Sequence, residues 1–163
     1  MKKVGIIMGS DSDLPVVKKA PAVLDELKIP YEVHVYSAHR TPVEAAEFAK
    51  AAHDNGFGAI IAVAGMAAHL AGALAANTLL PIIGIPCKSN CFDGMDALLS
   101  TVMMPPGIPV ASVGVDAGKN AALMAAEIIA VADEELYAAL GEMRNAEKEK
   151  TLEKDKKINE SLD

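Results

Sequence analysis

A histidine and an arginine stand next to each other in the segment Ser37-Ala38-His39-Arg40-Thr41-Pro42. An imidazole exchanges protons near neutral pH, and a guanidinium is a permanent cation that binds phosphate through two parallel hydrogen bonds. His39 and Arg40 therefore offer an acid–base group beside an anion-binding group. An isolated His-Arg dipeptide is more often a solvated surface pair, so the functional interpretation depends on two other segments of the chain.

Hydroxyl and carboxylate side chains follow the first apolar segment. Ser10 and Ser12 can donate hydrogen bonds to a phosphate or a ribose, and Asp11 or Asp13 can accept them from ribose hydroxyls. Because a carboxylate repels phosphate, we expect the phosphate on Arg40, Ser37 and a serine of this segment, and the sugar on Asp13. An acid–base histidine would then move a proton on the group that the sugar carries.

Small residues fill a third segment, which runs from Gly65 to Gly72 and includes His69. They let backbone N–H groups approach a ligand closely, and a helix that begins near Ala67 would direct its positive end toward an anion. A tightly packed crossover on the sheet explains the same residues equally well. His69 ranks behind His39 as a proton carrier, because backbone amides alone could hold a carboxylate in this segment.

Each of the three segments follows a predicted β-strand. Apolar or β-prone residues, with helical patterns between them and no hairpin signal, predict strands at 3–8, 30–36, 59–64, 81–86 and 110–113. This alternation is typical of an α/β protein with a three-layer, doubly wound parallel sheet of the flavodoxin-like strand order 2-1-3-4-5. One crevice at the carboxyl ends of the strands would then collect residues 9–13, 37–42 and 65–72.

Capping residues and one proline mark the helices that follow the first two strands. Ser12 or Asp13 suits the N-cap of the first helix, and Thr41 suits the N-cap of the second. Pro21 lies inside the first helix, where we expect it to kink the helix or to leave one carbonyl unpaired.

Length, composition and charge narrow the class of protein. The 163 residues fit one domain, with a catalytic part at 1–132 and a charged helical extension of it at 133–163. Hydrophobic residues make up 52% without a long apolar span, and the net charge is −7, so we expect neither a membrane nor a nucleic acid as partner. The first residues lack the length and cleavage site of a signal peptide, which favours the cytoplasm. Cys87 and Cys91 are expected to be reduced thiols rather than zinc ligands.

The predicted helix at 120–132 is apolar on nearly every side. Such a helix indicates burial against the sheet and also against another subunit, so we expect an oligomer. The extension that follows is rich in charged residues and has few apolar anchors. Its last residues are expected to fray or to lie across a neighbouring subunit.

Several motifs of the chain resemble the PurE family of purine biosynthesis. They are GSDSD at 9–13, SAHRTP at 37–42, AGMAAHLAG at 64–72, LPIIGIP at 80–86, GMDALLS at 94–100 and MPPGIPV at 104–110. The resemblance extends from residue 4 to about residue 130. GSDSD and SAHRTP after consecutive strands are far more specific together than either motif alone.

The resemblance implies an isomerase that acts on N5-carboxyaminoimidazole ribonucleotide. The carboxylate would move from the exocyclic amine to the ring carbon through bound aminoimidazole ribonucleotide and CO2, without a metal or an organic cofactor. The resemblance also implies a homo-octamer, His39 as the proton carrier, and a loop that cradles the migrating carboxylate. The implied substrate contacts are Ser10, Ser12, Asp13, Ser37, Arg40, Gly65, Met66, Ala67, His69 and Leu70.

Two alternatives to this isomerase remain open. Direct carboxylation by CO2 is one, because Met66 replaces a glycine of the usual AGGAAHLPGM motif, and the usual MPGGVPV also reads MPPGIPV here. The retained SAHRTP favours the carbamate, since the CO2-using branch resembles a lysine-containing form. A non-catalytic flavodoxin-like or receiver-like nucleotide-binding module is the other. A receiver needs an acid after the third strand, where this chain has Val63-Ala64-Gly65, and a flavin site favours aromatic residues, of which the chain has three Phe, three Tyr and no Trp.

Overall fold

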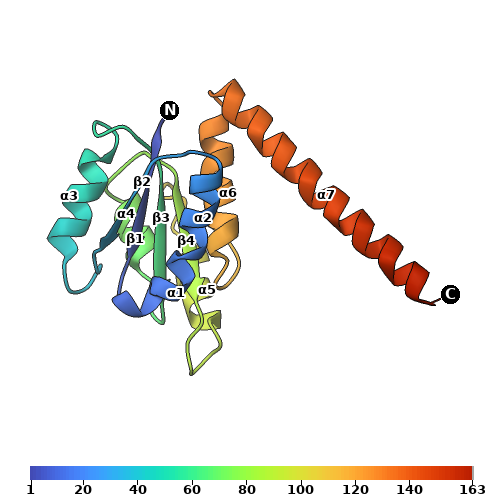
Figure 1. Ribbon diagram of the computed structural model, residues 1–163. Helices are drawn as coiled ribbons and strands as arrows, with labels where there is room; N and C mark the ends of the chain where they lie inside the picture. The colour runs from blue at the N-terminus through green and yellow to red at the C-terminus, as the bar shows by residue number, and fades with distance from the viewer. Residues whose placement is uncertain (163) are drawn as a thin grey trace.

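The computed structural model describes residues 1–162 and shows a five-stranded, all-parallel sheet between two layers of helices (Figure 1). The strands lie in the order β2-β1-β3-β4-β5, which confirms the predicted fold class and strand order. Their bounds are β1 (Lys3–Met8), β2 (Tyr31–Val35), β3 (Phe57–Gly65), β4 (Ile82–Cys87) and β5 (Ala111–Ser112).

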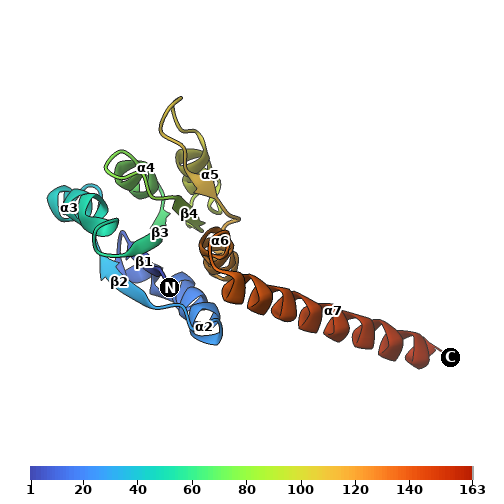
Figure 2. The ribbon, with the colours of Figure 1, turned by 90° about the horizontal axis from the view of Figure 1, so that it is seen from above.

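Helices cover both faces of the sheet, as Figure 2 shows from above. In β1, Ile6 belongs to the core on one face and Ile7 to the core on the other, and both are 0% exposed. A strand buried on both sides needs a helical layer on each face. One layer holds α1 (Leu14–Val17), α2 (Lys19–Glu26) and α6 (Gly118–Ala130), and the other holds α3 (Pro42–Ala52), α4 (Leu70–Ala75) and α5 (Met95–Val102).

The segment after β1 forms two helices rather than one helix kinked at Pro21. A 3-10 turn, η1 (Asp11–Asp13), leads into α1, and the chain bends at Lys18 before α2 begins. Pro21 therefore lies in the first turn of α2. Backbone N–H groups have no partner within the helix at that position, so the missing donor of proline costs little.

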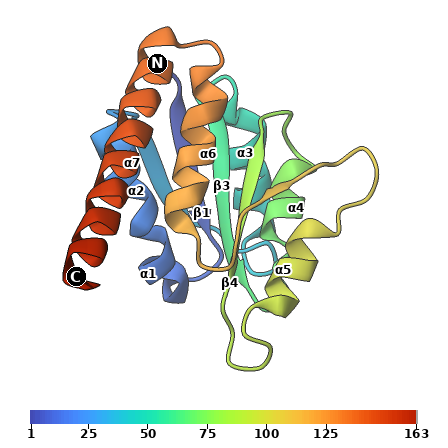
Figure 3. The same cartoon turned by 90° about the vertical axis from the view of Figure 1, so that its right-hand side faces the viewer.

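The apolar helix α6 is covered largely by its own chain. It packs on α2, β3 and β4, and the first turns of α7 (Glu134–Leu162) lie against it (Figure 3). Leu136 and Leu140 of α7 are buried in the same core, and Arg144 donates a hydrogen bond to Glu127 of α6. The first turns of α7 therefore supply part of the cover that the sequence assigns to another subunit, while Met124 of α6 remains 38% exposed.

The charged extension is one continuous helix that leaves the body of the protein (Figures 1 and 2). Every residue from Arg144 to Leu162 is exposed, including Leu152 and Ile158. The extension is helical to Leu162, so the expected fraying is not seen in the described residues. Within residues 1–162, no helix combines the length and apolarity that a membrane span requires.

Gly84 of β4 allows α5 to approach the sheet closely. A Cβ atom at this position would overlap Cγ2 of Thr101, a side chain that is 2% exposed. We expect Gly84→Ala to lower the free energy of unfolding by about 2 kcal/mol, because α5 would have to move away from β4. Gly114→Ala is the control, since its Cβ would meet only Ala117 at 3.7 Å. Urea unfolding compares the variants, and equal stabilities would contradict the close packing.

Candidate active site

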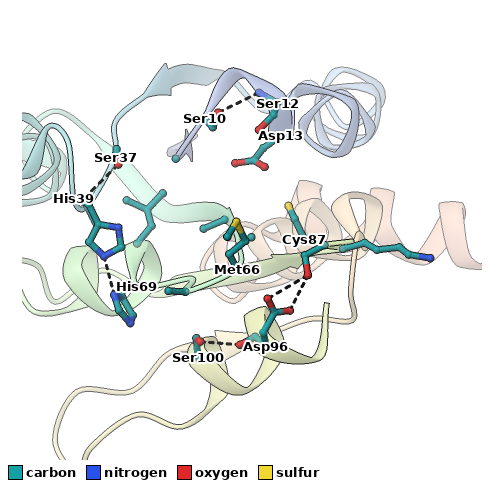
Figure 4. Close-up of a pocket in the computed structure, with 18 of the residues that line it drawn as sticks. Ser10, Ser12, Asp13, Ser37, His39, Met66, His69, Cys87, Asp96 and Ser100 are labelled. Atoms are coloured by element: carbon teal, nitrogen blue, oxygen red, sulfur yellow. Dashed lines mark hydrogen bonds between the residues drawn. The ribbon is translucent and has the colours of Figure 1, made fainter. Parts of the chain in front are cut away.

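A cavity of about 1120 Å³ opens where β1, β2, β3 and β4 end (Figure 4). The structure brings together all the residues that the sequence singled out. They are Ser10, Ser12, Asp13, Ser37, His39, Arg40, Gly65, Met66, Ala67, His69 and Leu70.

The loop after β1 is held by the hydroxyl of Ser10. Its Oγ accepts a hydrogen bond from the Ser12 N–H at 3.4 Å and donates one to Asp11 Oδ1 at 3.2 Å. Ser10 therefore caps the turn η1, whereas Asp13 occupies the predicted N-cap position of α1 but its side chain makes no capping hydrogen bond. Because Asp13 makes no capping hydrogen bond, its carboxylate remains directed into the cavity (Figure 4).

The loop after β2 folds around Ser37. Its Oγ accepts hydrogen bonds from the N–H groups of His39, at 3.3 Å, and Arg40, at 3.2 Å. Thr41 occupies the N-cap position of α3, but its Oγ1 accepts from the Ser37 N–H at 2.8 Å and makes no capping bond. The predicted cap is therefore replaced by a closed loop that fixes the backbone under His39 and Arg40.

Arg40 joins the second loop to the first. Its guanidinium donates a hydrogen bond to the backbone oxygen of Gly9 at 2.9 Å. A guanidinium has five N–H donors, so others can serve an anion. Burial raises the pKa of the Asp13 carboxyl above its usual value, and the nearby charge of Arg40 opposes that rise. The cavity therefore holds a cation and a partly desolvated carboxylate close together.

His39 and His69 form a hydrogen-bonded pair of imidazoles. His39 Nε2 lies 2.8 Å from His69 Nδ1, and the two ring planes meet at 76°. One nitrogen must donate and the other accept, so this contact holds a single proton. The second nitrogen of His39, Nδ1, then faces the cavity (Figure 4). From the sequence, His39 and His69 were alternative candidates for the proton carrier. In the structure the two rings are hydrogen-bonded to each other.

The loop after β3 is a pair of short turns rather than the start of a helix. The N–H of Ala68 bonds to the oxygen of Met66 at 2.9 Å, and the N–H of His69 bonds to the oxygen of Ala67 at 2.8 Å. Helix α4 begins only at Leu70 and has six residues. The expectation that a helix near Ala67 directs its positive end at a ligand is therefore wrong. Leu70 is 2% exposed and forms part of the core beneath the cavity.

The loop after β4 and helix α5 form a fourth wall, which sequence reasoning missed. Ser89 Oγ donates to both carboxylate oxygens of Asp96 at 3.2 Å, and Ser100 Oγ donates to the backbone oxygen of Asp96 at 2.7 Å. The predicted strand order already implied this wall, because β4 lies beside β3 and must end at the same edge of the sheet. Cys87, Lys88, Asn90, Cys91 and Phe92 complete this wall.

The donor set suits an anionic sugar derivative better than a metal ion. Within residues 1–162, no three His, Cys, Asp or Glu side chains gather closely enough to hold a metal. Hydroxyls, one guanidinium and carboxylates instead line the cavity. These groups can bind a phosphate and a ribose at the same time.

Comparisons with known proteins identify the family. Residues 3–150 match the family described as AIR carboxylase. The chain belongs to this family. It is 56% identical over 144 residues to an N5-carboxyaminoimidazole ribonucleotide mutase of Pyrococcus abyssi, covering 88% of this chain and 83% of that protein. A mutase of Bacillus subtilis is 51% identical over 152 residues, covering 92% of this chain and 94% of that protein.

A solved structure extends the likeness to three dimensions. The crystal structure of Treponema denticola PurE superposes with a TM-score of 0.85 at 30% identity, covering 95% of this chain and 97% of that one. The resemblance drawn from the sequence motifs is thus confirmed. In this member of the AIR carboxylase family, the motifs GSDSD, SAHRTP and AGMAAHLAG form three of the four walls of the cavity.

The two thiols of this AIR carboxylase family member differ in burial, and Cys87 is the buried one. Burial is the main cause of the shift in its pKa. It raises the pKa of Cys87 from 9.0 to about 12, and the negative charge of Asp13 adds to the shift. Cys91 is exposed. Because thiols react as thiolates, we expect iodoacetamide at pH 8 to label Cys91 and to spare Cys87 in the folded protein. Mass spectrometry checks this, with unfolded protein as the control in which both react.

The same shift predicts how stability changes at high pH. The raised pKa of Cys87 stabilises the folded state below about pH 9, and this contribution is lost as the pH rises toward 12. The variant Cys87→Ala should therefore lose less stability than the wild type over that interval. Equal labelling of the two thiols, or identical pH profiles, would contradict the burial of Cys87.

Proposed function

We propose that the cavity binds N5-carboxyaminoimidazole ribonucleotide and that the protein is a mutase of purine biosynthesis. The carboxylate moves from the exocyclic nitrogen to the ring carbon. The observation that carries this proposal is the hydrogen bond between His39 and His69, which presents one proton carrier to the same cavity that holds Arg40. Relatives that bear the mutase name at 56% and 51% identity support it.

Different walls of the cavity bind different parts of the substrate, according to the charges of their side chains. Arg40 and the hydroxyls of Ser37 and Ser10 receive the phosphate, because a guanidinium matches two phosphate oxygens. The protein has a net charge of −7, so these local groups must offset its overall repulsion of an anion. Asp13 and Ser12 receive the ribose hydroxyls. This division keeps the Asp13 carboxylate away from the phosphate.

A single proton carrier is sufficient for the rearrangement, because the substrate gains one proton and loses one. The N–C bond of the carbamate breaks, the nitrogen gains a proton and CO2 is released in the cavity. The ring carbon then forms a C–C bond to CO2 and loses its own proton. One proton enters the substrate and one leaves, so Nδ1 of His39 can perform both transfers. His69 holds the His39 ring through Nε2 and fixes which nitrogen faces the substrate.

The other two candidate functions are less well supported. Direct carboxylation of aminoimidazole ribonucleotide would remove a ring proton without returning one to nitrogen, and so would release one proton per turnover. A non-catalytic nucleotide-binding module gives no reason for a paired proton carrier in the cavity. Relatives that carry the mutase name favour the rearrangement over both.

The choice of carboxyl donor tests the proposal. The purified protein receives either the carbamate without added bicarbonate or aminoimidazole ribonucleotide with bicarbonate. We expect 4-carboxy-5-aminoimidazole ribonucleotide from the carbamate. Product from the second mixture alone would instead support direct carboxylation. Binding of both ligands without any product would support the non-catalytic module.

We further propose a homo-octamer, supported by an apolar stripe on α5. The stripe consists of Met95, Leu99 and Val102, which are 55%, 51% and 47% exposed, and Phe92 and Met103 extend it. Exposed apolar area of this kind is typical of surfaces that other subunits cover. The projecting helix α7 would lie across a neighbouring copy through Leu152 and Ile158.

Light scattering and sedimentation test the assembly. We expect a species of about eight copies at micromolar concentration, because covering the α5 stripe removes apolar area from water. Leu99→Glu should shift the distribution toward smaller species, and Glu47→Gln at an exposed position of α3 is the control. A stable monomer of 17.0 kDa would contradict the proposal.

We also propose a cytoplasmic location. Cys87 and Cys91 are both free thiols, and thiols stay reduced in the cytoplasm.

Substitution of each histidine tests the roles proposed for the pair. His39→Asn should lower turnover by about 10² to 10⁴-fold with little loss of ribonucleotide binding, because Asn cannot carry a proton at neutral pH. His69→Ala should cost about tenfold through misplacement of the His39 ring. His69→Asn should recover part of that loss, since its amide can occupy the place of Nδ1.

Steady-state kinetics and equilibrium binding measure these effects. Near-normal turnover in His39→Asn together with an inactive His69→Asn would reverse the assignment of the proton carrier. Unfolding midpoints close to the wild-type value serve as the control for folding.

A further inference from the structure

Met66 adopts a backbone conformation that methionine rarely takes. Its φ is +55°, in the left-handed region that favours glycine. Among residues 1–162, three other non-glycine residues share this feature, namely Lys28, Asp93 and Asp116. The two aspartates are of a type that tolerates left-handed backbone, and Lys28 lies on an exposed turn after α2. Met66 alone of the four lines the cavity.

The side chain of Met66 projects into the cavity instead of packing in the core. It is 67% exposed, although methionine is an apolar residue. Figure 4 shows it rising from the end of β3 into the space between Asp13 on one wall and Asp96 on the other. A left-handed methionine costs about 1 kcal/mol of strain, and glycine would avoid that cost. Strain retained at a cavity wall indicates that the side chain serves the cavity.

The backbone of Met66 shapes the turn that leads to His69. Its backbone oxygen accepts the hydrogen bond from Ala68 that shapes the short turn before His69, and His69 holds His39. Met66 and His69 therefore lie on the same loop after β3, and His69 joins that loop to His39 in the loop after β2. The thioether of Met66 and the ring of His39 thus both line the cavity.

We propose that Met66 is an apolar cover that keeps CO2 beside the imidazole ring between its release and its recapture. The inference rests on the mutase function proposed above. CO2 is small and uncharged, so charged groups hold it weakly and its escape must be prevented by the walls of the site. A thioether on three rotatable bonds can adapt to the ring and close the gap above it. The same cover excludes water, to which released CO2 would otherwise be lost.

Retention of a ¹³C label in the product tests directly whether Met66 acts as a cover over CO2. Carbamate labelled with ¹³C in its carboxylate is converted in unlabelled bicarbonate with carbonic anhydrase, which exchanges any CO2 that escapes. The fraction of product that keeps the label is measured, together with the aminoimidazole ribonucleotide that is set free. The spontaneous loss from carbamate without protein is subtracted.

Three variants separate the side chain from the backbone strain. Met66→Gly removes both, Met66→Ala removes the side chain beyond Cβ and keeps the strain, and Met66→Leu keeps an apolar cover. We expect escape of CO2 to rise roughly tenfold in the Gly and Ala variants, the order expected when about two methylene-sized groups are removed from around an apolar solute. Met66→Leu should retain the label nearly as well as the wild type.

Lys28→Gly is the matched control, because it relieves a left-handed residue with φ of +56° outside the cavity. It and Met66→Gly should both raise the unfolding temperature, but only Met66→Gly should lose label. Full retention of the ¹³C label in Met66→Gly and Met66→Ala would contradict the role of Met66 as a cover. That result would not contradict the mutase function. A wild-type protein that makes no product from carbamate would instead refute the function itself.

Discussion

The parallel pairing of four neighbouring strands is the constraint on which the site depends. Met8 of β1 pairs with Val35 of β2 and with Val63 of β3, and Gly65 of β3 pairs with Cys87 of β4. These registers bring the strands to an end along one edge of the sheet. The loops that follow must therefore lie side by side, although they are far apart in the sequence. A shift of any strand by one residue would turn its side chains to the opposite face and separate the groups of the cavity.

Hydrogen bonds between the loops convert this common edge into a defined site. Arg40 reaches back to Gly9, and His39 meets His69 across 30 positions of the sequence. The first contact couples Arg40, the proposed anion-binding group, to the loop that carries Asp13. The second orients the ring of His39, the proposed proton carrier. Such preorganisation lowers the cost of orienting these groups during the reaction.

The sequence predicts the strands from local patterns, and it predicts their order and three walls of the cavity from the topology of doubly wound parallel sheets. Apolar runs mark the buried strands, and polar or small residues mark the loops. The pairing of His39 with His69 was not predictable, because it depends on the relative height of two loops. The fourth wall carried no motif of acid–base or phosphate-binding residues, so Asp96 and Ser89 were missed although strand order implied their position.

The predictions about α6, Thr41 and the start of α4 differ from the structure for one physical reason. Each feature depends on contacts with residues outside the segment from which it was predicted. Leu136 and Leu140 of α7 pack on the apolar helix α6, and no periodicity within α6 could reveal that its own chain returns to it. Thr41 binds Ser37 instead of capping α3. The turns that occupy the amides of Ala68 and His69 delay the start of α4.

A crystal structure of the protein with 4-carboxy-5-aminoimidazole ribonucleotide is the most direct test of the central claim, that the four walls form one catalytic site. The account predicts the phosphate within hydrogen-bonding distance of Arg40, and a ribose hydroxyl on Asp13. It also predicts Nδ1 of His39 facing the ring carbon that bears the carboxylate. A ribonucleotide bound outside the cavity, or one with its phosphate beside Asp13 and its ring away from His39, would contradict the account.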